Sequence, residues 1–262
     1  MSVDQPFSGA EWKVKWAFDK IGNLDKECAK YIENSSYRLV IMEDRDTMDK
    51  IIKIKNETPI PEEIYELVGV AIYHLRSSLD QLTVSLGKIS GVINTDHLYF
   101  PFEGDREKFL SAKQGRRKIK GLKPDLVDIF NKIAPYKGGN DQLFALSHLA
   151  NVDKHNVIFP VGAVGNLSFL QGVKIQGAKQ SLILDGGKYR LDQGIPISNL
   201  GSSGSFTQLG NNSSIQVNAD ICFGNTPFYQ GARVVPVLYE LADIVGDVVR
   251  NFKMHCIANK YI

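Results

Sequence analysis

A chain of 262 residues and 29.2 kDa is long enough to bury one large core or two small ones. Hydrophobic residues make up 43% of it and charged residues 23%, which is the usual balance of a soluble globular protein. The formal net charge of +2 excludes the strong overall attraction to nucleic acid that a highly basic chain would have.

Cysteine usage and the lengths of the apolar segments indicate a reducing cytoplasmic setting. The three cysteines are scattered and no CxxC pair occurs, so the sequence predicts neither a zinc cage nor a disulfide framework. Residues 1–12 lack the basic start and apolar run of a signal peptide. Charged residues interrupt every long apolar segment, so none is expected to span a membrane. We therefore expect a soluble, cytoplasmic protein with no membrane partner.

Apolar residues at helical spacing predict an amphipathic helix over residues 11–34. They are Trp12, Trp16, Ile21, Leu24, Cys28 and Ile32. Because a tryptophan stripe at this spacing usually faces a core, we expect core packing of both tryptophans rather than a binding surface. Residues 37–43 and 50–55 then flank a polar turn with strand-like runs, which predicts a β-hairpin.

The next predicted helix contains the most unusual stretch of the chain, residues 72–86, which read IYHLRSSLDQLTVSL. Pro61 is expected to be the first residue of this helix, with two glutamates favouring its N-terminal end, and the helix is expected to end near residues 87–91. Apolar residues on nearly all sides of it indicate burial. Its polar residues include His74, Arg76, Asp80 and Gln81. Because buried charges are costly unless they are paired, these residues need partners.

Residues 113–123, KQGRRKIKGLK, form the most basic run of the chain. This run could contact a phosphate backbone or form a solvated loop. Because no aromatic residue is interleaved with the basic ones to stack on bases, we favour the loop. Two further helices are predicted, over residues 125–133 and 142–152, and the second leads directly into Asp153, Lys154 and His155.

From residue 157 the pattern changes to short apolar or alternating runs separated by glycines, which predicts strands. Residues 201–214 have the composition of a flexible loop, and residues 234–255 return to a helical pattern. The predicted fold class is α+β in a single domain, residues 1–262. It has an antiparallel helical body (1–155 and 234–258), an N-terminal β-hairpin, and a β-rich insertion (156–233) before the C-terminal helix.

Several of these segments resemble those of a widespread bacterial protein family with no assigned function. They are HLRSSLDQL (74–82), LYFPFEG (98–104), KIKGLKPDLVDIFNKIAPY (118–136), NVDKHN (151–156) and GARVVPVLYELADIVGDVVRNF (231–252). The family's corresponding motifs are similar to NLRSALDHL and NIDKHR. Gln81 stands where the family often has histidine, and Asn156 where it often has arginine. The resemblance implies no established activity.

Two sets of polar residues suggest a shared polar centre between helices. Arg76 and Asp80 are four residues apart and can pair on one helix face, beside a stripe that contains His74. Asp153, Lys154 and His155 end another helix. We infer that the two helices pack so that Arg76, Asp80, Asp153 and His155 meet. Two interpretations stay open, namely a structural network that fixes helix register and a site that binds a small ligand or a partner protein.

Other site chemistries have less support in the sequence. His148, Asp153 and His155 are legitimate metal ligands, but their spacing matches no known metal-binding signature. No serine lies in a GxSxG elbow, which argues against a Ser/His/Asp hydrolase. We therefore expect no bound metal and no cofactor.

One motif near the C-terminus suggests catalysis. Residues 250–255, RNFKMH, resemble the RNxxxH signature of HEPN-type ribonucleases. This resemblance implies a metal-independent endoribonuclease that acts on RNA as a homodimer, with Arg250, Asn251 and His255 in the site. In it, Arg250 would hold the scissile phosphate and His255 would move the 2′-hydroxyl proton. The other interpretation is a helix end whose cations meet the negative end of the dipole. The ribonuclease is the alternative to our leading hypothesis, a ligand-binding or partner-binding protein.

Overall fold

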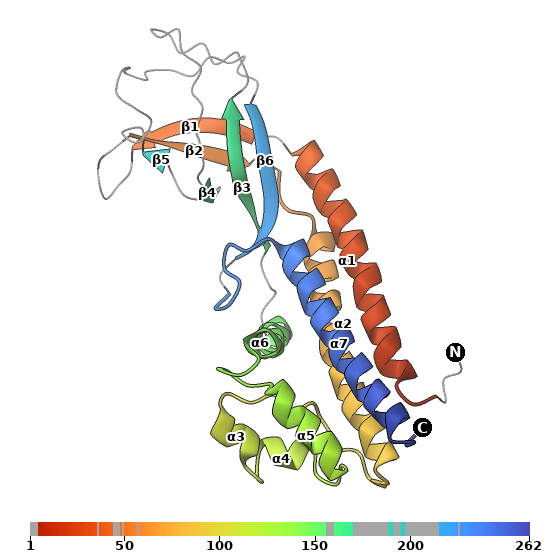
Figure 1. The fold of residues 1–262 in the computed structure, drawn as a ribbon. Helices are drawn as coiled ribbons and strands as arrows, with labels where there is room; N and C mark the ends of the chain where they lie inside the picture. Colours follow the sequence, from red (N-terminus) through yellow and green to blue (C-terminus); the bar gives the residue numbers. More distant parts are fainter. Residues whose placement is uncertain are drawn as a thin grey trace.

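The computed structural model describes residues 5–35, 37–43, 48, 50–56, 58–155, 160–169, 189–190, 195–196, 215–224 and 226–262. In these ranges the chain is mostly helical, with seven helices. Three long helices, α1 (Ser8–Asn34), α2 (Glu62–Ile89) and α7 (Val234–Ala258), form an elongated body (Figure 1). The shorter helices are α3 (Arg106–Leu110), α4 (Gly115–Lys118), α5 (Pro124–Ile133) and α6 (Asp141–His155).

The contacts between the long helices fix their relative directions. Near its start, α1 contacts the second half of α2, where the Ser78 hydroxyl donates to the carbonyl of Ala10 at 2.9 Å. The same end of α1 contacts the last part of α7, where Lys253 Nζ lies 2.5 Å from Glu11 Oε1. Helix α1 is therefore antiparallel to both α2 and α7, whereas α2 and α7 are parallel to each other. The prediction of an antiparallel body is correct for α1.

The strands lie at the end of the body where α1 ends and α7 begins (Figure 1). Strands β1 (Tyr37–Glu43) and β2 (Lys50–Asn56) pair antiparallel from Tyr37 opposite Asn56 to Glu43 opposite Lys50, which are the segments predicted to form the hairpin. The remaining strands are β3 (Pro160–Phe169), β4 (Tyr189–Arg190), β5 (Ile195–Pro196) and β6 (Ile215–Phe223). β5 pairs with β2, and β3 pairs with β4 and β6. Most of the predicted insertion 156–233, including the loop 201–214, lies outside the described residues.

The helix boundaries follow from local sequence signals. Pro61 precedes α2 as its N-cap with extended backbone, one position earlier than predicted. At the other end of α2, Gly91 has a φ of 82° and donates to the carbonyl of Lys88, a conformation that favours glycine. Pro124 is the first residue of α5, where its missing N–H is not needed.

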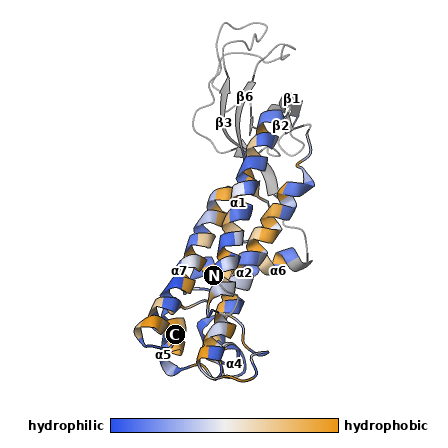
Figure 2. Ribbon diagram, turned by 90° about the vertical axis from the view of Figure 1, so that its right-hand side faces the viewer, coloured by the Kyte–Doolittle hydropathy of each residue, from blue (hydrophilic) through white to orange (hydrophobic). Residues whose placement is uncertain are grey.

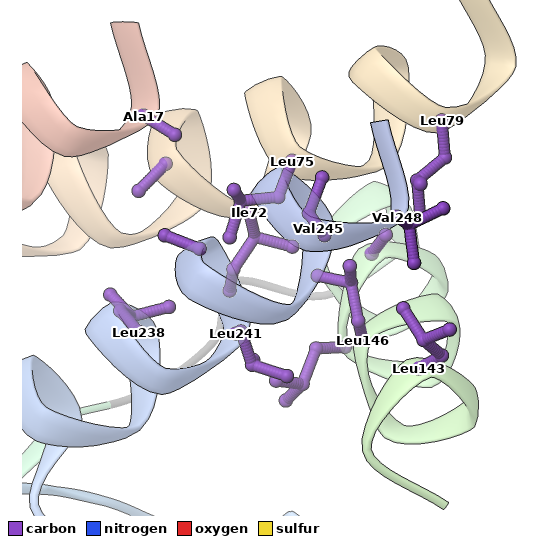
Figure 3. Packing of buried hydrophobic residues seen from close by; sticks show 14 of the residues in the cluster. Ala17, Ile72, Leu75, Leu79, Leu143, Leu146, Leu238, Leu241, Val245 and Val248 are labelled. Atoms are coloured by element: carbon purple, nitrogen blue, oxygen red, sulfur yellow. The ribbon is translucent and has the colours of Figure 1, made fainter. Parts of the chain in front are cut away.

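The hydrophobic core lies where α2, α7 and α6 meet. Figure 3 shows side chains of α2, such as Ile72 and Leu75, directed toward Leu241 and Val245 of α7 and Leu146 of α6. Each of these five side chains is fully buried. Hydrophilic and hydrophobic segments alternate along the long helices in Figure 2, as the amphipathic patterns of α1 and α7 predict.

The expectation that both tryptophans of α1 are buried in the core is wrong. Trp16 is 43% exposed and Trp12 is only partly buried. The core face of α1 is instead made by Ala10, Ala17, Ile21, Leu24, Cys28 and Tyr31. Because successive residues are about 100° apart on a helix, Trp12 and Trp16 lie about 160° and 120° around α1 from Ala10, outside this stripe. Small side chains at Ala10 and Ala17 bring α1 close to its neighbours, which leaves no room for an indole on that face.

Truncation in the core is expected to separate buried from exposed apolar positions. Leu75→Ala is expected to lower the free energy of unfolding by about 2–5 kcal/mol, because Leu75 is fully buried and its loss leaves a cavity. Ile93→Ala is expected to change it by less than about 0.5 kcal/mol, because Ile93 is fully exposed. Urea denaturation of both variants measures the difference. Equal effects of the two substitutions would contradict this core.

Candidate functional site

The Arg76–Asp80 pair of α2 contacts the segment that follows the helix. Arg76 Nη1 lies 2.6 Å from Asp80 Oδ1, which confirms the predicted pair. The same Asp80 oxygen accepts the backbone N–H of Phe100 at 2.9 Å. The Arg76 guanidinium lies over the ring of Phe102, 4.4 Å from its centroid. The side chains of Arg76 and Asp80 are only 20% and 29% exposed, so this ion pair is partly shielded from water.

Asp153 does not join this pair, although α2 and α6 pack together as inferred. Its carboxylate lies beside Gly69, with Oδ1 3.0 Å from where a Cβ on that glycine would be. Gly69 precedes Arg76 by seven residues, which is about 10 Å along the helix. The predicted meeting of Arg76, Asp80 and Asp153 is therefore wrong, because α6 crosses α2 nearer its N-terminus. The side chains of Lys154 and His155 lie outside the described residues.

His74 faces α1 rather than the Arg76 side of α2. Its ring lies 5.6 Å, centroid to centroid, from the rings of both Trp16 and Tyr73, and its Nδ1 is 3.4 Å from Lys13 Nζ. Burial lowers the pKa of His74, and the positive charges of Lys13 and Lys20 lower it further. Because His74 and Arg76 are about 200° apart around the helix, they belong to different sites.

A cleft of about 640 Å³ lies along the start of α1 and the second half of α2. We call it the α1–α2 cleft. Of the predicted site residues it contains Asp80, and Gln81 lies next to it on the wall. Its full lining is Gln5, Pro6, Ser8, Gly9, Asp80, Gln81, Val84, Ser85, Lys88, Ile89, Thr95, Asp96, Leu98 and Tyr99. A Cβ on Gly9 would lie 2.5 Å from Gln81 Oε1, so glycine permits this close approach of α1 to α2.

Sequence reasoning missed most of this cleft. It identified Asp80 but not Lys88, Asp96, or the hydroxyls of Ser85 and Thr95. One signal was available, since Gln81, Ser85 and Lys88 recur at helical spacing and continue a polar stripe beyond residue 81. Residues 5–9 line the cleft only because of how α1 packs on α2, and no local sequence pattern predicts that packing.

The charges of the cleft are two carboxylates and one ammonium, from Asp80, Asp96 and Lys88. Among the described residues, only one Asp80 oxygen, Oδ1, accepts hydrogen bonds, one from Arg76 and one from Phe100. The wall thus offers a fixed anionic acceptor, a cation, hydroxyls and an apolar area, which together suit a small polar molecule.

The three residues of the RNFKMH motif do not gather in one place. Arg250 Nη1 lies 2.6 Å from Asp247 Oδ1 on an exposed face, and Asn251 is also exposed. His255 Nε2 lies 2.6 Å from Asp125 Oδ2 at the start of α5. Since residues 250 and 255 are about 140° apart around α7, a site within one chain cannot use both.

The contacts of His255 tie the C-terminal residues to α5. Asp125 Oδ2 also accepts the Tyr261 hydroxyl at 3.0 Å, and Asn259 Nδ2 lies 3.2 Å from His255 Nε2. Hydrogen bonds from His255 and then Tyr261 hold the pKa of Asp125 below its usual value. Lys123 Nζ lies over the Tyr261 ring, 4.1 Å from its centroid.

The basic run 113–123 has intramolecular partners for part of its charge. Lys118 donates to the carbonyl of Phe102 and pairs with Glu103 at 2.7 Å. Arg116 donates to Asn131 at 2.6 Å. Lys113, Arg117 and Lys120 are exposed. The run is therefore partly structural and partly solvated, and α4 makes part of it helical rather than a plain loop.

The described histidine and cysteine side chains do not form a metal site or a reactive thiol. His148 packs edge-on against Phe228, with 5.3 Å between ring centroids. In the part of the chain that the structure describes, no three histidine, cysteine or acidic side chains come close enough to hold a metal ion. Burial raises the pKa of the Cys28 thiol to about 12 and that of Cys256 to about 11, so both stay protonated at neutral pH.

Comparisons with known proteins give no assignment. No family model, no curated protein and no solved structure matches this chain. The resemblance of HLRSSLD and NVDKH to a bacterial family therefore stays a prediction, as does the resemblance of RNFKMH to HEPN-type ribonucleases. Within the described ranges, no helix combines the length and the apolarity needed to cross a membrane.

The surroundings of Asp153 predict a pH-dependent effect on stability. Burial raises the pKa of Asp153, so folding favours its neutral form. Its charged form at neutral pH destabilises the fold, and this penalty grows as pH rises through the raised pKa. Asp153→Asn is therefore expected to raise the free energy of unfolding at pH 7. The gain should shrink as pH falls toward about 4, the usual aspartate value.

Urea denaturation of wild type and Asp153→Asn at several pH values measures this effect. Asp243→Asn is the matched control, because Asp243 is exposed on α7. The control should show no such gain. A loss of stability in Asp153→Asn at pH 7 would mean that the carboxylate is favourably paired in the folded protein, contrary to this interpretation.

Proposed function

We propose that this protein binds a small polar ligand that carries an amino group, in the α1–α2 cleft. The observation that supports this most directly is the fixed carboxylate of Asp80. Arg76 and the Phe100 N–H hold one of its oxygens, at 2.6 and 2.9 Å, while Asp80 lines the cleft. An acceptor that is already oriented loses little conformational entropy when a ligand donates to it.

The other residues of the cleft narrow the chemistry of the ligand. Asp80 and Asp96 outnumber Lys88, so the cleft favours a group with positive charge. Lys88 offers a counter-charge to a carboxylate on the same ligand, and Gln81 offers both a donor and an acceptor. Val84 and Leu98 supply an area for a short hydrocarbon portion. Free amino acids have all of these features, and short diamines have the positive charge and the hydrocarbon portion.

The size of the cleft agrees with this class of ligand. Its volume of about 640 Å³ falls within the range of roughly 300–1,000 Å³ that is usual for small-molecule sites. Arg76 does not line the cleft, so its part is to position Asp80.

Ligand-observed NMR with a panel of free amino acids and short diamines tests the proposal. At least one compound is expected to bind, and Asp80→Asn is expected to weaken it about tenfold through loss of the charged hydrogen bond. Asparagine keeps an oxygen that accepts from Phe100 N–H, so the fold should persist, and circular dichroism checks this. Asp96→Asn, at an exposed edge of the cleft, is expected to have a smaller effect.

The control for this experiment is Asp243→Asn, which removes one negative charge from an exposed position on α7. It is expected to leave binding unchanged. If no compound of the panel binds, or if the control weakens binding as much as Asp80→Asn does, the proposal is rejected.

A second candidate function is a metal-independent endoribonuclease that acts as a homodimer. The observation that favours it is the pair of His255 and Asp125 at 2.6 Å, since a carboxylate that orients an imidazole is a common feature of general bases. Because Arg250 lies on another face of α7, it would have to reach the site from a second chain.

Incubation of purified protein with RNA in the presence of a chelator tests this second candidate. Wild type is expected to cleave the RNA, and His255→Ala and Arg250→Ala are each expected to reduce cleavage by at least about 100-fold. His97→Ala, which changes a histidine on the loop after α2, should cleave like wild type. Equal cleavage by all variants, or none by wild type, rejects the ribonuclease.

A further inference from the structure

Four ring-bearing side chains form an exposed surface where α1 lies beside α2. They are Trp12, Trp16, Tyr73 and His74, and we call them, together with Lys13, the aromatic surface. Trp16 is 43% exposed and Tyr73 is 57% exposed. The rings of Trp12 and Trp16 are stacked with 6.5 Å between centroids, and the His74 ring lies 5.6 Å from both Trp16 and Tyr73.

This arrangement is not explained by core packing. A fully buried position would suit a tryptophan, yet the core face of α1 is made by smaller side chains, and the rings lie outside it. Large exposed aromatic residues that lie next to one another are unusual on a protein surface, where single apolar residues are the rule. The cluster is therefore a candidate for an interaction site.

Positive charge accompanies the rings. Lys13 Nζ lies 5.3 Å from the centroid of the Trp16 ring and 4.9 Å from that of Tyr73. Lys20 lies one turn beyond Trp16 on α1, close enough for its positive charge to lower the pKa of His74. The neighbouring Lys15 and Asp19 pair with each other at 2.7 Å and so add little net charge. The surface thus combines exposed rings with two lysines, Lys13 and Lys20.

From this combination we infer that the aromatic surface binds single-stranded nucleic acid, with bases on Trp16 and Tyr73 and phosphates on Lys13 and Lys20. Every unpaired base offers a flat face on which an aromatic ring can stack, and the nucleic-acid backbone is anionic. A single strand therefore matches both the exposed rings and the lysines of this surface. The ammonium of Lys13 over the rings disfavours a cationic ligand. Paired bases in a duplex are not available to these rings.

The inference goes beyond the proposed function, because the aromatic surface shares no residue with the α1–α2 cleft. The two lie on the same pair of helices, and Lys13 follows Gly9 of the cleft by one helical turn, about 6 Å. A variant of the aromatic surface therefore tests nucleic-acid binding without altering the lining of the cleft. Failure of either proposal leaves the other intact.

Tryptophan fluorescence, excited at a wavelength that tyrosine does not absorb, reports on this surface alone, since Trp12 and Trp16 are the only two tryptophans of the chain. Titration with an oligothymidylate of about 15 nucleotides, within the size range of single-strand sites, is expected to quench this fluorescence. A duplex of the same length is expected to cause little quenching. Equal quenching by the duplex, or equal quenching by a mononucleotide at the same phosphate concentration, overturns the inference.

Substitutions locate the binding site. Fluorescence anisotropy of an end-labelled oligothymidylate is expected to show about tenfold weaker binding for Trp16→Ala and for Tyr73→Ala, through loss of stacking. Lys13→Gln should weaken binding at low salt and make it less dependent on salt. Met254→Ala and Lys137→Gln, at exposed positions on α7 and before α6, are matched controls that should bind like wild type.

Two other results would overturn the inference. One is equal loss of binding in the control variants, which would mean that attraction is not localised at the aromatic surface. The other is a concentration-dependent dimer, seen by analytical ultracentrifugation, that Trp16→Ala and Tyr73→Ala both dissociate. That result would mean that a second copy of the chain covers these rings. Circular dichroism of each variant confirms that a loss of binding is not a loss of fold.

Discussion

The structure depends on how α2, a helix buried on most of its sides, accommodates its polar residues. Burial of an unpaired charge or hydroxyl would cost more than most single apolar contacts contribute. The polar side chains of α2 therefore contact different neighbouring segments. Ser78 bonds to the backbone of α1, the Arg76–Asp80 pair holds the Phe100 N–H, and His74 packs on rings and Lys13. These contacts set the register of α1 on α2 and fix the segment that follows α2.

That register also determines what the surface of the helix pair offers. Small residues at the interface let α1 approach α2, notably Ala10 and Ala17 on the core face and Gly9 beside Gln81. Because Ala10 and Ala17 face the core, the orientation of α1 about its own axis places Trp16 outside the core. The close packing of α1 on α2 thus accounts for both features of this helix pair. The cleft lies at one part of the α1–α2 interface, and the aromatic surface lies at the adjacent part.

Sequence periodicity was sufficient to predict the long helices and the Arg76–Asp80 pair, because both depend on residues close together in the chain. It was not sufficient for the partners of that pair, since Phe100 reaches Asp80 from a separate segment. The position of Asp153 beside Gly69 likewise depends on where α6 crosses α2. The tryptophans were misplaced because their spacing fits a core face, whereas the buried Ala17 and Ile21 lie roughly 100–180° around the helix from Trp12 and Trp16.

Charge links the two proposed ligands. The cleft has two carboxylates against one ammonium, whereas the aromatic surface has Lys13 and Lys20. Along α2, Asp80 of the cleft lies seven residues, about 10 Å, from Tyr73 of the aromatic surface, which is close to the screening length of roughly 8 Å at physiological salt. An ammonium group bound at Asp80 would offset a negative charge near the path of an anionic strand. Each ligand would then favour the other, and thermodynamic reciprocity makes the two effects equal. Because the coupling acts through charge alone, it needs no change of shape.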